Sequence, residues 1–169
     1  MTALADRIDR LTAAIGRTSA WLAVAIVVTQ FAVVVLRYAL STGSIWLSES
    51  ILYAHAGLFM LAAAWTLREG GHVRVDIFYA DVAPRRKAMI DCAGALLLLI
   101  PFALALIVLS LPYVARSWSI LERSRETSGL PLVFLLKTLI PVFGVLLLLQ
   151  GVSQAIRAAV LLRGGAPRR

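Results

Sequence analysis

The sequence predicts an all-α membrane protein with four transmembrane helices and with both termini on the cytoplasmic side. The chain has 169 residues, of which 60% are hydrophobic, and its mean hydropathy is +0.86. Charged residues make up only 15%, against about 25% in an ordinary soluble domain. A soluble fold of this size would lack the polar surface to cover its exterior, so we expect lipid to face most of it.

The first predicted span covers residues 19–38, and Trp21 and Tyr38 bracket it as aromatic belts do. An amphipathic segment, residues 2–17, precedes it. Because its apolar residues recur at helical spacing, we expect this segment to lie at the membrane interface and to run into the span. No small-residue cleavage site follows the apolar run, so we expect the run to be retained rather than removed as a signal peptide.

Three further apolar runs predict spans at about residues 45–67, 88–118 and 132–162. The run at 88–118 exceeds the ~20 residues that cross a bilayer, so it should tilt, bend or protrude. Pro101 and Pro112 are its expected bend points. The whole chain, residues 1–169, is expected to form a single membrane domain, without an internal repeat.

The orientation follows from the basic residues. With four spans, the N-terminal segment, the loop at residues 68–87 and the C-terminal tail lie on one side, and most of the lysines and arginines fall there. Loops rich in lysine and arginine stay in the cytoplasm. Both termini are therefore predicted to be cytoplasmic.

Glu49 is the most informative acid, because it lies near the start of the second span, where a charge is costly without a partner. Arg37 lies across a short turn, so we predict an Arg37–Glu49 ion pair that locks the first hairpin. A proton- or cation-coupling carboxylate is the functional alternative. Trp46 is expected to anchor the start of this span at the interface.

Lys137 is a lone cation early in the fourth span, and it could snorkel outward or pair with Glu122 or Glu126. Gln30 and Gln150 are candidates for hydrogen bonds between helices or for a partner interface.

The stretch at residues 70–77 alternates polar and apolar side chains after two glycines. His72, Arg74 and Asp76 would point one way and the valines and isoleucine the other, as in an extended or interfacial segment. The stretch lacks the Gly-Lys-Ser/Thr ending of a phosphate loop.

Several function classes are disfavoured. The net charge of +8 and the pI of about 10.8 would suggest nucleic acid in a soluble protein, but here the basic residues flank apolar runs and suit a membrane surface. His55 and His72 are the only histidines and Cys92 the only cysteine, so we expect no metal, haem or other cofactor. No nucleophile stands with a base, so enzyme activity is not expected.

Three motifs resemble a known family. They are Trp46-Leu47-Ser48-Glu49 at the second span, Arg68 to Ile77 after it, and Ser128-Gly129-Leu130-Pro131 with Lys137 to Pro141 at the fourth span. Pro131 suits the first turn of that last helix. With four spans at this length, the chain resembles the small membrane subunit of tripartite ATP-independent periplasmic (TRAP) transporters, the DctQ-like family.

The resemblance implies a subunit of the bacterial inner membrane that pairs with a large permease subunit. In that family the large subunit holds the substrate and sodium sites, and a periplasmic binding protein delivers the solute, commonly an organic acid. Uptake is secondary transport driven by an ion gradient. The small subunit is thought to extend the static scaffold against which part of the large subunit moves.

Two alternatives make different predictions. A small self-sufficient multidrug-type exporter would form homodimers and would use Glu49 as its coupling carboxylate. A membrane anchor for a redox enzyme would bind haem, and the positions of His55 and His72 argue against it.

Overall fold

In the computed structural model, which describes residues 2–72 and 82–164, the chain is built from helices. They are α1 (Thr2–Ala39), α2 (Ile45–Arg68), α3 (Pro84–Gly94), a π-helical turn η2 (Ala95–Leu99), α4 (Ile100–Ser119) and α5 (Val133–Leu162). Since α3, η2 and α4 follow one another without a break, four helical rods are long and apolar enough to span a membrane. The predicted all-helical class and the four spans are confirmed.

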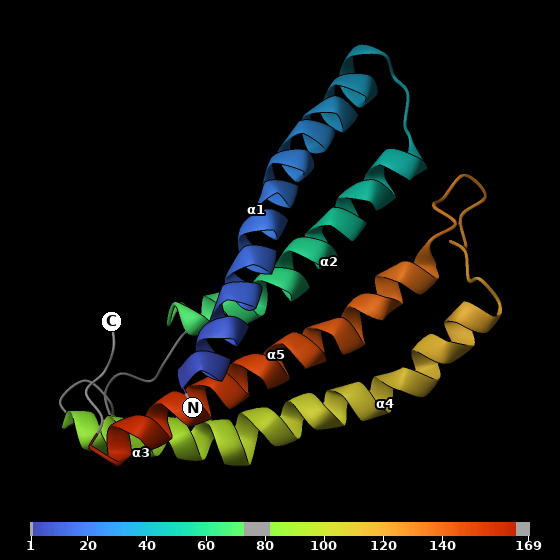
Figure 1. Ribbon diagram of the computed structural model, residues 1–169. Helices are drawn as coiled ribbons and strands as arrows, with labels where there is room; N and C mark the ends of the chain where they lie inside the picture. The colour runs from blue at the N-terminus through green and yellow to red at the C-terminus, as the bar shows by residue number, and fades with distance from the viewer. Residues whose placement is uncertain (1, 73–81, 165–169) are drawn as a thin grey trace.

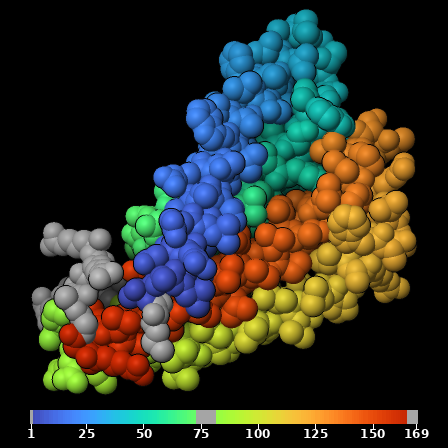
Figure 2. Space-filling model, in the orientation of Figure 1, coloured from blue at the N-terminus to red at the C-terminus, as the bar shows by residue number. Residues whose placement is uncertain are grey.

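The rods form an open layer rather than a closed bundle. In Figure 1, α2 lies between α1 and α5, and α4 lies on the far side of α5. Among the described residues, α5 packs against α1, α2, α3 and α4, whereas α4 packs against neither α1 nor α2. Figure 2 shows the α1–α2 hairpin rising away from the α4–α5 hairpin. The core of the molecule therefore runs along α5.

Burial follows this arrangement. In the most apolar window of α1 only 6% of the residues are buried, against 28% in that of α5. Large apolar side chains such as Phe31 and Leu109 are 69% and 75% exposed. In water such a surface would drive association, but lipid tails or another membrane protein can cover it.

Both ends of α2 follow from local sequence. Ser44 precedes the helix, and its Oγ accepts a hydrogen bond from the N–H of Leu47 at 3.3 Å. At the other end Gly70 has a φ of +70°, and the N–H groups of Gly70 and Gly71 donate to the carbonyls of Leu67 and Thr66. This is a glycine-terminated helix end.

The predicted bend in the third span coincides with the π-helical turn η2. Proline lacks an N–H donor, and its ring crowds the carbonyl four residues earlier. The wider π-helical turn, Ala95–Leu99, ends two residues before Pro101 and accommodates both effects. The rod from Pro84 to Ser119 has 36 residues, about 54 Å at 1.5 Å per residue, and Figure 1 shows it curving.

The N-terminal segment differs in part from its prediction. It is continuous with the first span, as expected, and Leu4 and Leu11 are exposed. However, Asp9 and Thr12 are buried, because this part of α1 packs against α5 as well as α2. The segment expected at the membrane interface thus also forms part of an interface between helices.

The two ends of the layer differ in what they gather. Figure 1 shows the start of α1, the end of α2, α3 and the end of α5 together at one end. The turn at residues 40–44 and the loop at residues 120–132 lie at the other end. Below, the first is called the terminal end and the second the loop end.

Candidate functional site

Glu49 joins the two hairpins at the loop end. It lies in the second turn of α2, and its Oε2 accepts a hydrogen bond from the N–H of Leu130 at 2.5 Å. Its Oε1 accepts a hydrogen bond from the Oγ of Ser124. Both oxygens are therefore used by the loop between α4 and α5, and hydrogen bonds to an ionised acceptor are among the stronger ones.

The predicted Arg37–Glu49 ion pair is wrong. Arg37, in the last turn of α1, lines the same surface pocket as Glu49, Ser44 and Glu126, but none of the ion pairs in the described residues joins Arg37 to Glu49. The physical reason is that hydrogen bonds from the loop satisfy the Glu49 carboxylate, so the charge does not need Arg37 as a partner. The partner of Glu49 comes from far along the chain, not from the neighbouring turn.

Gly129 is placed where no side chain fits. A Cβ at this position would lie 2.3 Å from the Oγ of Ser124 and 2.7 Å from the Oε1 of Glu49. The residues that the motifs singled out in α2 and in the loop thus meet at one point.

Two other motif residues lie close by in the sequence. Pro131 was expected in the first turn of the last helix, but α5 begins at Val133, so Pro131 is an exposed loop residue. Trp46 is 53% exposed in the first turn of α2, where a bilayer or a partner can cover it.

Lys137 pairs with Glu122, one of the partners that the sequence offered. Its Nζ lies 2.5 Å from the Oε2 of Glu122, which also accepts a 2.7 Å hydrogen bond from Ser117. The Nζ lies 4.1 Å from the centroid of the Tyr113 ring, a cation–π distance. Hydrogen bonds from Lys137 and Ser117 hold the pKa of Glu122 below its ordinary value, because they favour the charged carboxylate.

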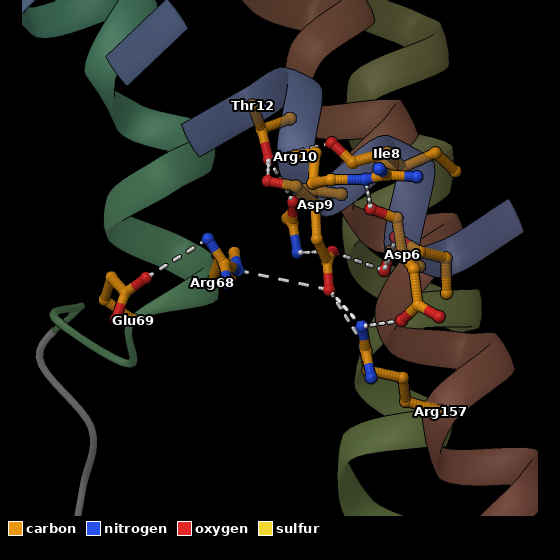
Figure 3. Close-up of polar contacts among 11 residues, drawn as sticks. Asp6, Ile8, Asp9, Arg10, Thr12, Arg68, Glu69 and Arg157 are labelled. Atoms are coloured by element: carbon orange, nitrogen blue, oxygen red, sulfur yellow. Dashed lines mark hydrogen bonds and ion pairs between the residues drawn. The ribbon is translucent and has the colours of Figure 1, made fainter. Parts of the chain in front are cut away.

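A second cluster, at the terminal end, is centred on Asp9 (Figure 3). The Asp9 side chain is 7% exposed. Its Oδ1 accepts hydrogen bonds from Ser153 at 2.6 Å and from Gln150 at 3.2 Å. Its Oδ2 accepts a hydrogen bond from the Nε of Arg157 at 2.9 Å. A buried carboxylate is tolerated only with such partners.

The terminal cluster ties together three helices. Arg157, in α5, also donates to Asp6 at 2.8 Å, and Thr12 donates to the Oε1 of Gln150 at 2.9 Å. From α2, the Nε of Arg68 reaches within 4.0 Å of Asp9. The side chains of Asp6, Asp9, Arg68, Gln150 and Arg157 are among those that line a pocket of about 600 Å³.

Sequence reasoning missed most of this cluster. It gave Asp9 no partner, although it named Gln150 as a candidate for hydrogen bonds between helices, which the structure confirms. A usable signal was present: Gln150, Ser153 and Arg157 recur at helical spacing in an otherwise apolar run. Polar residues repeated on one face of a spanning helix indicate a helix interface.

The remaining predicted residues are less informative. His55 and Gln30 are exposed, and the His55 ring stacks on Phe59 with centroids 6.1 Å apart. His72 is exposed just beyond the end of α2. Arg74 and Asp76 lie outside the described residues.

The cluster at Glu49 and the cluster at Asp9 each hold the two hairpins together. Each engages a carboxylate of one hairpin with donors of the other, and the faces between them are apolar. In the described part of the chain, no three His, Cys, Asp or Glu side chains stand where they could hold a metal ion. The fold and the clusters define a multi-pass helical membrane protein whose polar groups fix its own helices.

Comparison with known families gives a specific assignment. Residues 8–161 match the family described as tripartite ATP-independent periplasmic transporters, DctQ component. The chain belongs to this family, which supplies the small membrane subunit of transporters that also contain a large permease and a binding protein. Neither the curated proteins nor the solved structures gave a match to the chain.

Proposed function

We propose that this chain is the scaffold subunit of a TRAP-type secondary transporter in a bacterial inner membrane. It binds a large permease subunit, and the complex imports a small solute, an organic acid, delivered by a periplasmic binding protein. Residues 1–169 act as one membrane domain in this complex. The observation that carries the proposal is the open helix layer, in which the Asp9 and Glu49 carboxylates are bound within the described part of the chain and large apolar side chains remain exposed.

The polar clusters suit a rigid support. A scaffold must keep its shape while a partner moves against it, and the two clusters tie the hairpins at opposite ends of the layer. Interfaces and packed helices that are fixed in this way resist continuous deformation. The exposed apolar side chains of α1 and α4 then supply contact area for the large subunit.

The exporter alternative has no support in these contacts. A coupling carboxylate must exchange its proton or cation with the transport path. Glu49 instead uses both oxygens to hold the backbone and side chain of a loop. The residues that select the solute are proposed to lie in the large subunit and in the binding protein.

The test is co-purification from native membranes with a C-terminal tag in mild detergent. We expect a large, very hydrophobic partner in fixed proportion, identified by mass spectrometry. Proteoliposomes with both membrane subunits and the binding protein should take up an organic acid, and omission of this chain should abolish uptake. A clean homo-oligomer that transports alone would refute the proposal.

A further inference from the structure

Two adjoining pockets lie where the end of α5 packs against α3 and η2. The first is an apolar trough of about 310 Å³, lined by Leu96 and by Ala155, Ala159 and Val160 of α5, with Arg163 at its end. The second has a volume of about 640 Å³ and is lined by Pro84, Arg85, Leu161, Arg163 and Gly164. Arg163 lines both, so the two pockets lie on either side of this residue.

The charge of the second pocket is not neutralised in the described part of the chain. Both Arg85 and Arg163 are exposed, and none of the ion pairs found there joins either of them to an acid. A guanidinium group offers several N–H donors in a plane and binds phosphate oxygens in pairs. The basic pocket therefore suits one phosphate group.

The trough fits the other half of the same ligand. Leu96 is 50% exposed, and the small side chains of Ala155 and Ala159 leave a furrow along α5. The trough runs inward along the spanning helices, while α3 begins at Pro84 and α5 ends at Leu162. The apolar lining of the trough suits a lipid acyl chain. The two arginines at the ends of the helices suit the charged headgroup of the same lipid.

We propose that these pockets together bind an anionic phospholipid from the leaflet that faces the termini. Its phosphate lies between Arg85 and Arg163, and one acyl chain lies along the trough. The lipid fills the junction of α3 and α5 and so stabilises the terminal end of the layer. This site is separate from the two clusters described above and goes beyond the proposed transport role.

The test is lipid retention by the purified full-length protein, with its large subunit where that co-purifies, measured by native mass spectrometry. Phosphatidylglycerol should be retained at least about tenfold more than diacylglycerol with the same chains. The double variant Arg85→Gln/Arg163→Gln and the trough-filling variant Ala159→Phe should each reduce retention at least about fivefold. Matched controls are Arg123→Gln/Arg125→Gln at the loop end and Ala105→Phe on the exposed face of α4.

Several results would overturn the proposal. If a variant and its control retained phosphatidylglycerol equally, the proposed lipid site would be refuted. Loss on Ala159→Phe but not on the double arginine variant would leave an apolar groove without headgroup recognition. Displacement of phosphatidylglycerol by millimolar inorganic phosphate would indicate a phosphate site with no role for the chain. Crosslinks from position 159 to the large subunit, with no lipid retained, would assign the trough to that partner.

Discussion

Asp9 and Glu49 are carboxylates at opposite ends of the molecule, and both are held by hydrogen bonds from distant parts of the chain. Each is a carboxylate close to the apolar layer, and each has both oxygens bound by groups from a distant part of the chain. Removing a buried charge's partner costs more than the pair itself contributes. Substitutions at these two acids should therefore be far more damaging than at exposed acids beside them.

Replacing Asp9 with asparagine should lower the free energy of unfolding by about 2 kcal/mol. The amide keeps one acceptor oxygen, but Arg157 keeps only Asp6 as a charged partner. The new NH2 group also faces the N–H and O–H donors that now bind the carboxylate. Thermal unfolding in detergent measures the effect. Asp6→Asn is the matched control, because Asp6 is 52% exposed and binds the same arginine; a loss below about 1 kcal/mol is expected there. Equal losses would contradict a special role for Asp9.

Replacing Glu49 with glutamine should lower the free energy of unfolding by about 1–3 kcal/mol. The new amide group cannot accept from both Ser124 and the N–H of Leu130. A charge swap, Arg37→Glu with Glu49→Arg, should restore none of the yield lost in the single variants. Fluorescence-detected size exclusion measures yield, and Glu126→Gln in the same loop serves as the control. Rescue by the swap would reinstate the ion pair that the sequence suggested.

Glu122 should make stability depend on pH. Its pKa is lowered by hydrogen bonds from Lys137 and then from Ser117, so its contribution is fully present above the ordinary glutamate pKa of about 4.3 and is lost as pH falls through the lowered value. The unfolding temperatures of wild type and Glu122→Gln should differ above about pH 5 and converge in more acidic solution. A difference that persists unchanged into acid would argue against this ion pair.

At the scale of the elements, close helix packing depends on small residues. A Cβ at Gly16 of α1 would lie 2.4 Å from the Cβ of Trp65 in α2. At Gly144 of α5 it would lie 2.8 Å from Ile107 of α4. Small residues let helix backbones approach closely in a membrane. Each hairpin thus has a close helix contact at a glycine, and α5 of the second hairpin also packs against α1 and α2 of the first.

Gly16→Ala should therefore be destabilising although alanine favours helices. The added carbon must push Trp65 and α2 away, at a cost of about 1–3 kcal/mol. Gly94→Ala is the control, since a Cβ there meets nothing within 4 Å; this variant should be neutral or more stable by up to about 1 kcal/mol. Denaturation in mixed detergent micelles compares the two. If both variants gained stability, the close contact of α1 with α2 would be refuted.

At the scale of the whole molecule, the layer arrangement fixes which ends lie together. The start of α1 and the end of α5 share the terminal end (Figure 1). The excess of lysine and arginine at this end predicts that it faces the cytoplasm.

Reporter fusions test that orientation. Alkaline phosphatase should be inactive at either terminus and active when inserted at residues 40–44 or 120–132, with fluorescent protein fusions giving the opposite pattern. Activity at one terminus only would mean that the number of crossings is odd. Activity at both termini would reverse the orientation.

The number of spans, their approximate limits and the family could all be derived from sequence. Spans 45–67 and 132–162 agree with Ile45–Arg68 and Val133–Leu162 because apolar length and glycine or serine ends are local properties. The choice of Glu122 for Lys137 was within reach for a similar reason, since the two residues are close in sequence.

Which distant groups meet follows only from the packing of the helices. Local patterns in the sequence are enough to predict a four-span chain with isolated charges near its ends, but the partner of Glu49 is a loop 75 residues away and that of Asp9 lies 148 residues away. Helical periodicity places a side chain on a face, yet it does not say which helix that face will meet. The open layer centred on α5 has the same origin, because nothing local in an apolar helix selects its neighbours.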